Sequence, residues 1–326
     1  MQTKTALITG ISGQDGSYLA EHLLKLGYSV HGLVRRNSVP EHQVSRIDLI
    51  SPEIQTHYSD LLDPLGIARI MDQVQPNEIY NLAAQSHVRI SFEIPKFTGE
   101  TNALGTLDLL ELVRVRFPET KFYQASSSEM FGDSVDMDNF QRETTAMHPV
   151  SPYGCAKLYA YHITRNYRKS YKIFAANGIL FNHESPRRGS NFVTSKIIKT
   201  AVQIKLGMAS ELVLGNLDSY RDWGHSRDYV KAMHLILNHE IADDFVVATG
   251  ETRSVRELCD LVFQQLGLDY LQFVTQDPKF LRPEELPYLR GDSSKIRSAL
   301  GWQPETTFEN LISEMVEFWM NRLSVH

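Results

Sequence analysis

Tyr153 and Lys157 are the first residues whose types and spacing suggest chemistry. They lie four positions apart in Ser151-Pro-Tyr-Gly-Cys-Ala-Lys157, so on a helix they would share one face. An ammonium beside a phenol favours the phenolate, which would bring a base of unperturbed pKa about 10 towards neutral pH. A Tyr-x-x-x-Lys pair also arises by chance on solvated helix surfaces. The catalytic interpretation therefore needs other residues that point to the same site.

Ser127 and Glu129 form a second candidate pair. They follow Lys121-Phe-Tyr-Gln-Ala-Ser126, which has the pattern of a buried strand. Ligands of open α/β sheets bind at the C-terminal ends of such strands. The same two residues would also suit a helix N-cap with an acid in the first turn. Because Tyr153 and Lys157 follow soon afterwards, we favour the catalytic interpretation.

A glycine-rich turn near the N-terminus indicates where a cofactor would bind. Thr5–Thr9 is predicted to be a buried strand, Tyr18–Leu26 a helix and Ser29–Val34 a second strand. Between the first strand and the helix, Gly10-Ile-Ser-Gly-Gln-Asp-Gly16 has G-x-x-G-x-x-G spacing rather than the commoner G-x-G-x-x-G. Such glycines allow close backbone approach, so that a pyrophosphate can lie at the helix N-terminus. A purely structural turn is the alternative.

The end of the second predicted strand favours NADP over NAD. An NAD site usually has an acidic residue there for the ribose 2′-hydroxyl, whereas this chain has Arg35-Arg36-Asn37-Ser38. Guanidiniums suit a 2′-phosphate; an exposed basic loop is the alternative interpretation. Asp60, in the acidic turn after the next strand, is placed to meet an adenine amino group.

Regular alternation of strands and helices in the first half predicts an α/β fold with a doubly wound parallel sheet. Glu78–Ala84 is predicted to be a strand and Thr101–Val113 a long helix. From Asn182 onward the alternation is lost, which indicates a smaller substrate-binding lobe. We therefore expect a dinucleotide-binding domain over 1–180, with later returns near 217–248, and a mainly substrate-binding lobe over 181–326.

Composition limits the classes of partner. The 326 residues carry a formal net charge of −6, which gives no electrostatic reason to expect nucleic acid or an anionic membrane as partner. Two cysteines form no disulfide framework and no metal-ligand spacing. No signal peptide and no membrane span are recognisable, so the cytoplasm is the expected location.

Over nearly its whole length the chain resembles the extended short-chain dehydrogenase/reductases, and within them the GDP-mannose 4,6-dehydratases. Two segments are specific to that branch: Asn177-Gly-Ile-Leu-Phe-Asn-His-Glu-Ser-Pro-Arg-Arg188 and Asp218-Ser-Tyr-Arg-Asp-Trp-Gly-His225. The resemblance also rests on Thr9–Leu19, Tyr80–Val88, Phe122–Glu129 and Ser151–Tyr161. Related 4-epimerases usually lack a glutamate at the place of Glu129.

The resemblance implies a role for each matching residue. The catalytic residues would be Ser127, Glu129, Tyr153 and Lys157, with serine where many relatives have threonine. The NADP contacts, which include the two arginines described above, would be Gly10, Ile11, Ser12, Gly13, Gln14, Asp15, Gly16, Arg35, Arg36, Asp60, Leu61, Leu82, Ala83, Ala84, Gln85, Ser86, Thr101, Tyr153, Lys157, His183 and Arg188. The GDP-sugar contacts would be Ser86, Ser127, Asn182, Lys196, Arg221, Arg282 and Glu284. The resemblance further implies a homo-oligomer, a dimer or tetramer.

The implied reaction converts GDP-D-mannose to GDP-4-keto-6-deoxy-D-mannose through bound NADP. The acidic loop over 133–141 and a short segment after Leu266 depart from several relatives, and both are expected to border the substrate. They leave open the same dehydration of a related GDP-sugar such as a GDP-heptose. A sugar-nucleotide epimerase or reductase is a further alternative, which Glu129 argues against. A non-catalytic NADP-binding protein would be expected to lack the intact Tyr, Lys and Glu set.

Overall fold

The computed structural model describes residues 3–36, 46–281 and 283–324. Within these residues, seven parallel strands form the central sheet in the order β11-β6-β5-β4-β1-β2-β3. The order reverses between β1 and β4, which makes this the point where a doubly wound sheet binds ligands. The predicted α/β fold class is therefore confirmed. The strands are β1 (Thr5–Thr9), β2 (Ser29–Val34), β3 (Ile54–Tyr58), β4 (Glu78–Asn81), β5 (Lys121–Ser127), β6 (Ala175–Leu180) and β11 (Asp244–Val247).

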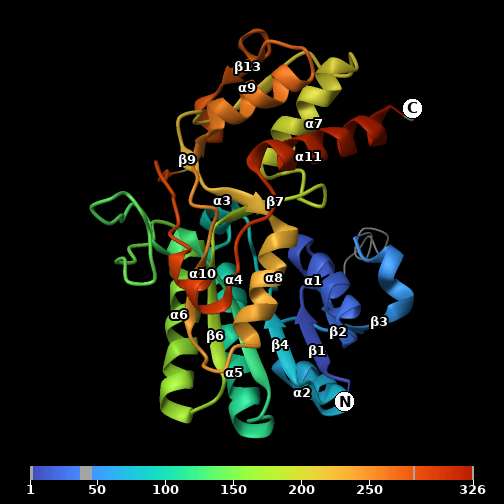
Figure 1. Ribbon diagram of the computed structural model, residues 1–326, viewed down its shortest axis with the longest axis vertical. Coiled ribbons are helices and arrows are strands. Elements are labelled where there is room, and N and C mark those ends of the chain that lie inside the picture. The colour runs from blue at the N-terminus through green and yellow to red at the C-terminus, as the bar shows by residue number, and fades with distance from the viewer. Residues whose placement is uncertain (1–2, 37–45, 282, 325–326) are drawn as a thin grey trace.

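Alternating side chains of the strands bury both faces of the sheet. On one face Ala6 and Ile8 of β1 pack with α1 and α8; on the other Leu7 packs with α2, α5 and α6. Figure 1 shows this helix–sheet–helix arrangement in the lower part of the molecule. The helices are α1 (Gln14–Lys25), α2 (Pro64–Val74), α3 (Val88–Glu93), α4 (Pro95–Gly99), α5 (Gly105–Arg116), α6 (Pro152–Tyr171) and α8 (Ser226–Leu237).

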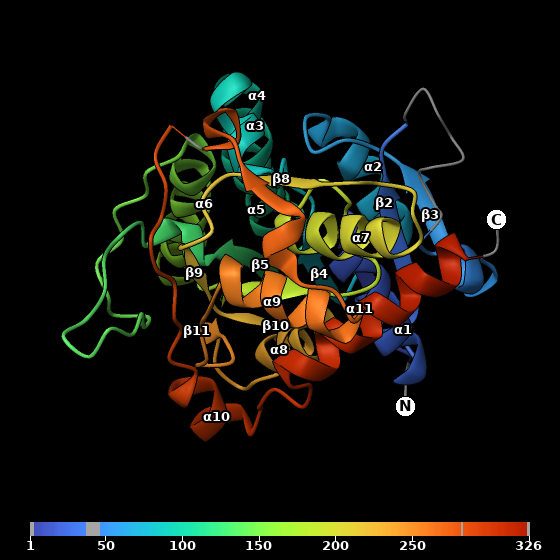
Figure 2. The ribbon, with the colours of Figure 1, turned by 90° about the horizontal axis from the view of Figure 1, so that it is seen from above.

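A second core lies above the C-terminal edge of the sheet. It is formed by α7 (Val193–Lys205), α9 (Val255–Gln265) and α11 (Phe308–Leu323) with β8 (Leu212–Leu214). Figure 2, seen from above, shows these three helices lying over the strands. Helix α9 begins with a capping box, in which Ser254 accepts from the Glu257 N–H and the Glu257 carboxylate accepts from the Ser254 N–H.

Short elements join the two cores. Strands β7 (Asn182–Glu184) and β10 (Trp223–His225) pair in parallel, while β9 (Tyr220–Arg221) pairs with β12 (Arg253–Ser254) and β13 (Val274–Gln276) with β8. The short helices are η2 (Asp48–Glu53), the π-helical η3 (Glu100–Leu104), η4 (Ser128–Met130), η5 (Tyr270–Gln272) and η6 (Pro278–Phe280). Helix α10 (Ser294–Leu300) returns to the first core, which includes Ile296 and Trp302, a return that the sequence interpretation did not include.

The loop over 133–141 extends away from the body of the molecule. At the base of this loop, Arg142 forms ion pairs with Asp136, Asp138 and Asp292 at 2.9, 2.6 and 2.7 Å. Figures 1 and 2 both show this green segment projecting outward. In the described part of the chain, no helix combines the length and the apolar character that crossing a membrane requires.

Candidate active site

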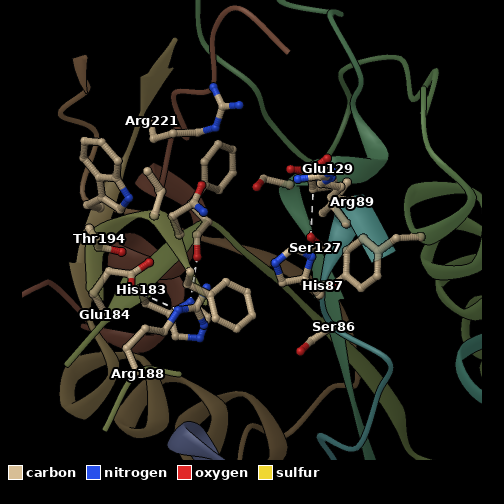
Figure 3. Close-up of a pocket in the computed structure, with 18 of the residues that line it drawn as sticks. Ser86, His87, Arg89, Ser127, Glu129, His183, Glu184, Arg188, Thr194 and Arg221 are labelled. Atoms are coloured by element: carbon tan, nitrogen blue, oxygen red, sulfur yellow. Dashed lines mark hydrogen bonds and ion pairs between the residues drawn. The ribbon is translucent and has the colours of Figure 1, made fainter. Parts of the chain in front are cut away.

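A cavity of about 430 Å³ lies between the C-terminal edge of the sheet and the upper lobe. Figure 3 shows its two walls: Ser86, Ser127 and Glu129 come from the sheet side, and His183 and Arg221 from the lobe side. Its size is that of a small-molecule site. Of the candidate site residues, the cavity is lined by Asp15, Leu82, Ala84, Ser86, Ser127, Glu129, Tyr153, Lys157, Asn182, His183, Arg188, Lys196 and Arg221.

The start of α6 brings Tyr153 and Lys157 into this cavity. Ser151 caps the helix by accepting from the Gly154 N–H at 3.0 Å, and Pro152 occupies the first turn, where its missing N–H costs nothing. Both side chains are buried. Lys157 Nζ donates to the Ala125 carbonyl at 2.8 Å and lies 5.8 Å from the centroid of the Tyr153 ring.

The protonation of this pair differs from the sequence-based expectation. Burial raises the pKa of Tyr153 to about 12, although a hydrogen bond with Ser127 opposes the rise. Burial also lowers the pKa of Lys157 to about 8, against the attraction of Asp15. The expected lowering of the phenol pKa by Lys157 is therefore wrong for the pocket as it stands, because burial disfavours the charged phenolate.

Ser127 and Glu129 lie where β5 ends and η4 begins. The Glu129 N–H donates to the Ser127 hydroxyl at 3.2 Å, so Ser127 is the N-cap of this single turn, as the structural alternative predicted. Both side chains are also buried and line the cavity, and Ser127 hydrogen-bonds Tyr153. Figure 3 draws the Ser127–Glu129 bond beside the open space. Capping and a catalytic role are thus compatible in this geometry.

The glycine-rich turn has the close packing that a dinucleotide site requires. Gly10 has φ of +70°, and a Cβ atom there would lie 3.0 Å from the Ala83 Cα. A Cβ on Gly16 would lie 2.3 Å from the Gly10 carbonyl oxygen. Helix α1 begins without a side-chain cap at Gly13, so that its first N–H groups are available to an anion. These features fit a dinucleotide pyrophosphate.

The remaining cofactor candidates lie outside the cavity lining. Arg35 and Arg36 are exposed at the end of β2; Asn37 and Ser38 lie outside the described residues. Asp60 accepts from the Leu62 N–H at 3.0 Å. Leu61 packs in the core beside Leu7 and Ile67, so only its backbone could meet a ligand. Thr101, Ala83 and Gln85 do not line the cavity either. Ala83 and Gln85 nevertheless alternate with Leu82, Ala84 and Ser86, which do line it.

His183 and Asp15 form an ion pair in the lining of the cavity. His183 Nε2 lies 2.8 Å from the Asp15 carboxylate, and its Nδ1 lies 2.7 Å from the Phe181 carbonyl. Burial disfavours both charges, yet the pair holds the pKa of Asp15 below and that of His183 above its ordinary value. Ser226, at the start of α8, also donates to Asp15 at 3.0 Å. The pair thereby ties the glycine-rich turn to the segment after β6.

Two cationic candidates from the lobe converge on the same cavity. Lys196 Nζ donates to the Val213 carbonyl at 2.6 Å, and Arg221 donates to the Leu286 carbonyl at 2.8 Å. Burial, then the positive charges of Arg89 and Lys279, lowers the pKa of Lys196. Cations gathered on one wall of a cavity suit a diphosphate.

The residues expected at the nucleotide end lie differently with respect to the cavity. Glu285 lines the cavity and Glu284 does not, because the neighbouring Leu286 is anchored in a core cluster and leaves Glu284 exposed. Arg282 lies outside the described residues. The loop over 133–141, expected to border the substrate, contributes nothing to the described lining.

Sequence reasoning missed several residues that line the cavity. Arg89 and His87 follow the Leu82–Ser86 segment, and Glu184 lies inside the Asn182–Arg188 run, so position in these motifs could have indicated them. Glu184 pairs with Arg188 Nε at 3.0 Å, and the guanidinium lies 3.7 Å from the centroid of the Phe192 ring. The remaining missed residues include Asn191, Thr194, Asn216, Trp223 and Phe280.

Comparison with known proteins agrees with this geometry. A family model described as GDP-mannose 4,6 dehydratase matches residues 7–315. GDP-mannose 4,6 dehydratase 2 of Arabidopsis thaliana is 50% identical over 324 residues, which cover 96% of this chain and 86% of the relative.

Two solved structures share the fold over almost the full length. RMD from Pseudomonas aeruginosa, complexed with NADPH, has a TM-score of 0.81 and 25% identity, covering 98% of this chain and 100% of the other. The dTDP-glucose 4,6-dehydratase from Bacillus anthracis, in complex with NAD, has a TM-score of 0.85 and 21% identity, covering 99% and 98%. The family match spans both cores and every element that lines the cavity, and the chain belongs to the GDP-mannose 4,6 dehydratase family.

Proposed function

We propose that this chain converts GDP-D-mannose to GDP-4-keto-6-deoxy-D-mannose, the 4,6-dehydration for which its family is named. The observation that carries the proposal is the presence of Glu129 in the same cavity as Tyr153 and Lys157. Oxidation of a sugar hydroxyl needs only the tyrosine and lysine. Removal of water from the sugar needs a further acid–base group, and Glu129 supplies it.

We propose NADP as the cofactor. When bound, the oxidised dinucleotide accepts a hydride from the sugar and later returns it, so the reaction involves no net oxidation. The glycine-rich turn and the uncapped start of α1 would hold the pyrophosphate, and Arg35 and Arg36 the 2′-phosphate. The NADPH complex of the Pseudomonas relative supports this choice, and the NAD complex of the Bacillus protein keeps NAD as the alternative.

In the proposed mechanism Tyr153 removes the proton of the sugar 4-hydroxyl. The Lys157 ammonium and the Ser127 hydroxyl stabilise the phenolate. Glu129 next takes the proton from C5, which the ketone at C4 has made acidic. The same carboxyl group then gives this proton to the departing 6-hydroxyl, which leaves as water and leaves a C5=C6 double bond. When C6 is reduced, a proton from solvent is added to C5. Ser127 hydrogen-bonds the oxygen on C4 during these steps.

The lobe side of the cavity would hold the diphosphate and the nucleotide. Lys196 and Arg221 are each oriented by a bond to a backbone carbonyl, and Arg89 adds a third positive charge nearby. Fixed guanidinium and ammonium groups bind phosphate oxygens strongly when partly shielded from water. We also propose that the chain forms a homo-oligomer, as the family resemblance implies, and that it acts in the cytoplasm.

The proposed reaction is tested by incubating the protein with NADP and either GDP-mannose or a GDP-heptose. Mass spectrometry should find a product lighter by one water from GDP-mannose. A dehydrated product formed only from the GDP-heptose would show that the protein catalyses the same reaction on the alternative substrate. A product of unchanged mass would indicate an epimerase, and a net change in NADP oxidation state a reductase.

We expect Arg35→Ala/Arg36→Ala to weaken NADP binding at least tenfold, about 1.4 kcal/mol, and NAD binding much less. The reason is that only NADP carries the phosphate that these exposed guanidiniums would bind. Calorimetry with each cofactor measures the difference. Arg116→Ala is a matched control, because it removes an exposed arginine that pairs with Asp72 elsewhere. Equal losses for both cofactors would show that Arg35 and Arg36 do not recognise the 2′-phosphate.

A further inference from the structure

Arg46 lies beside the glycine-rich turn and is held there by two backbone carbonyls. Its Nε–H donates to the Arg187 carbonyl at 2.8 Å, and its Nη1–H donates to the Ser12 carbonyl at 3.3 Å. Ser12 belongs to the turn that leads into α1, which begins at Gln14. The guanidinium therefore bridges the turn and the segment after β7, close to the N-terminal end of α1.

The described residues provide no carboxylate partner for Arg46, in contrast to its two arginine neighbours. Arg187 pairs with Glu21, and Arg188 pairs with Glu184 at 3.0 Å. Arg46 is half-buried and makes its two hydrogen bonds only to neutral carbonyls. A guanidinium has five N–H groups. Most of its donors and its whole charge therefore stay available to another group.

The surroundings of Arg46 favour an anion. Burial, and after it the positive charges of Arg187 and Arg188, lowers the pKa of Arg46. Arg187 and Arg188 already have carboxylate partners, so the charge that still lacks a negative partner among the described residues is that of Arg46. The start of α1 adds to the positive potential, because Gly13 provides no capping side chain for the first N–H groups. These independent observations meet at one corner of the fold.

We propose that Arg46 is a further cofactor-binding residue, whose guanidinium binds the pyrophosphate of the nicotinamide dinucleotide. The inference rests on the dinucleotide site proposed above. The pyrophosphate is the appropriate ligand group because Ser12 is part of the glycine-rich turn. The 2′-phosphate would instead meet Arg35 and Arg36 at the end of β2. A planar guanidinium suits two phosphate oxygens at once.

The test compares the binding of NADP, NAD and inorganic pyrophosphate to the wild type and to Arg46→Ala by calorimetry. Both dinucleotides carry the pyrophosphate, so we expect both to bind about tenfold more weakly to the variant. Inorganic pyrophosphate should raise the melting temperature of the wild type more than that of the variant. The ratio of the wild-type affinity to the Arg46→Ala affinity should also decrease as salt is added, because salt screens an ionic contact.

Arg46→Gln separates anion binding from simple bracing of the turn. Glutamine keeps a donor for the carbonyls but has no charge, so it should bind the cofactors as weakly as alanine does. Affinities of Arg46→Gln equal to those of the wild type would overturn the proposal in favour of bracing. A loss confined to NADP would reassign Arg46 to the 2′-phosphate and equally overturn it. Arg116→Ala should change none of these quantities.

The two proposals fail in different ways. A wild type that binds neither dinucleotide nor pyrophosphate would remove the nicotinamide site itself, and this inference with it. A wild type that binds all three, together with Arg46 variants that bind them equally well, would remove only the role of Arg46. Should Arg46→Ala unfold, Arg46→Gln gives the same decision, because glutamine keeps a donor for the carbonyls and lacks the charge.

Discussion

Tyr153→Phe is expected to slow the dehydration of GDP-mannose by about 10²- to 10⁴-fold at neutral pH, the range of a lost general base. The substitution removes one hydroxyl from a buried ring and almost no volume, so cofactor and substrate should still bind. Steady-state rates, cofactor affinity and melting temperature of the variant together measure the effect. A fall in rate with the other two unchanged assigns the loss to the chemistry.

Tyr159→Phe is the matched control, because Tyr159 lies on the same helix but is 41% exposed and outside the cavity. It should leave the rate unchanged. If Tyr153→Phe retained a rate near that of the wild type, Tyr153 would not be the base. The interpretation of the Tyr–Lys pair would then revert to a chance pair on α6.

The rate should also depend on pH in a defined direction. Burial raises the pKa of Tyr153 to about 12, so near neutral pH only a small fraction of the phenol is ionised. That fraction grows as the pH rises, and kcat/KM of the wild type should therefore increase with pH through the neutral range. Tyr153→Phe should lose this increase. A wild-type rate that falls from pH 6 to 8 would contradict a phenolate base.

The strands could be predicted from sequence more closely than the helices. The bounds of β1 and β2 match the prediction, because buried apolar runs and flanking glycines define them. Strand β4 ends at Asn81 rather than Ala84, since the Thr9 hydroxyl accepts from the N–H groups of Leu82 and Ala83 and draws them away from the ladder. That long-range contact has no local signal.

The helical predictions failed where the local period changes. The helix predicted over Thr101–Val113 begins at Pro95 and contains the π-helical η3, which places Thr101 and Asn102 in buried positions. A pattern with 3.6 residues per turn cannot reveal such a segment. Helix α1 begins at Gln14 rather than Tyr18, because Gly16 belongs to its first turn as well as to the glycine motif.

The residues of the candidate site also differ in how well the sequence predicts that they lie together. Tyr153 and Lys157 could be paired from spacing alone, because one helix carries both. Lys196 and Arg221 lie on α7 and β9, far apart in sequence, and only the resemblance to a family brought them together. The rise in the pKa of Tyr153 could not be predicted either, because it depends on burial by segments distant in the chain.

Glu129→Gln is expected to stop the reaction after the first hydride transfer. Glutamine keeps the shape and hydrogen bonding of the side chain but cannot remove the C5 proton. Mixed with NADP and GDP-mannose, the variant should accumulate reduced cofactor, seen by its absorbance, and release no 6-deoxy product. The wild type should show little reduced cofactor in the steady state, because the hydride is returned within each turnover.

Deuterated water gives a second measurement on the same variant. Wild-type product should gain deuterium at C5, where the proton is removed, and substrate recovered from Glu129→Gln should gain none. Glu184→Gln is the matched control, since Glu184 is another buried carboxylate of this cavity and is not assigned a proton transfer. It should not accumulate reduced cofactor. If Glu129→Gln formed 6-deoxy product at the wild-type rate, that result would falsify the acid–base role, and Glu129 would remain only the first-turn acid of η4, which Ser127 caps.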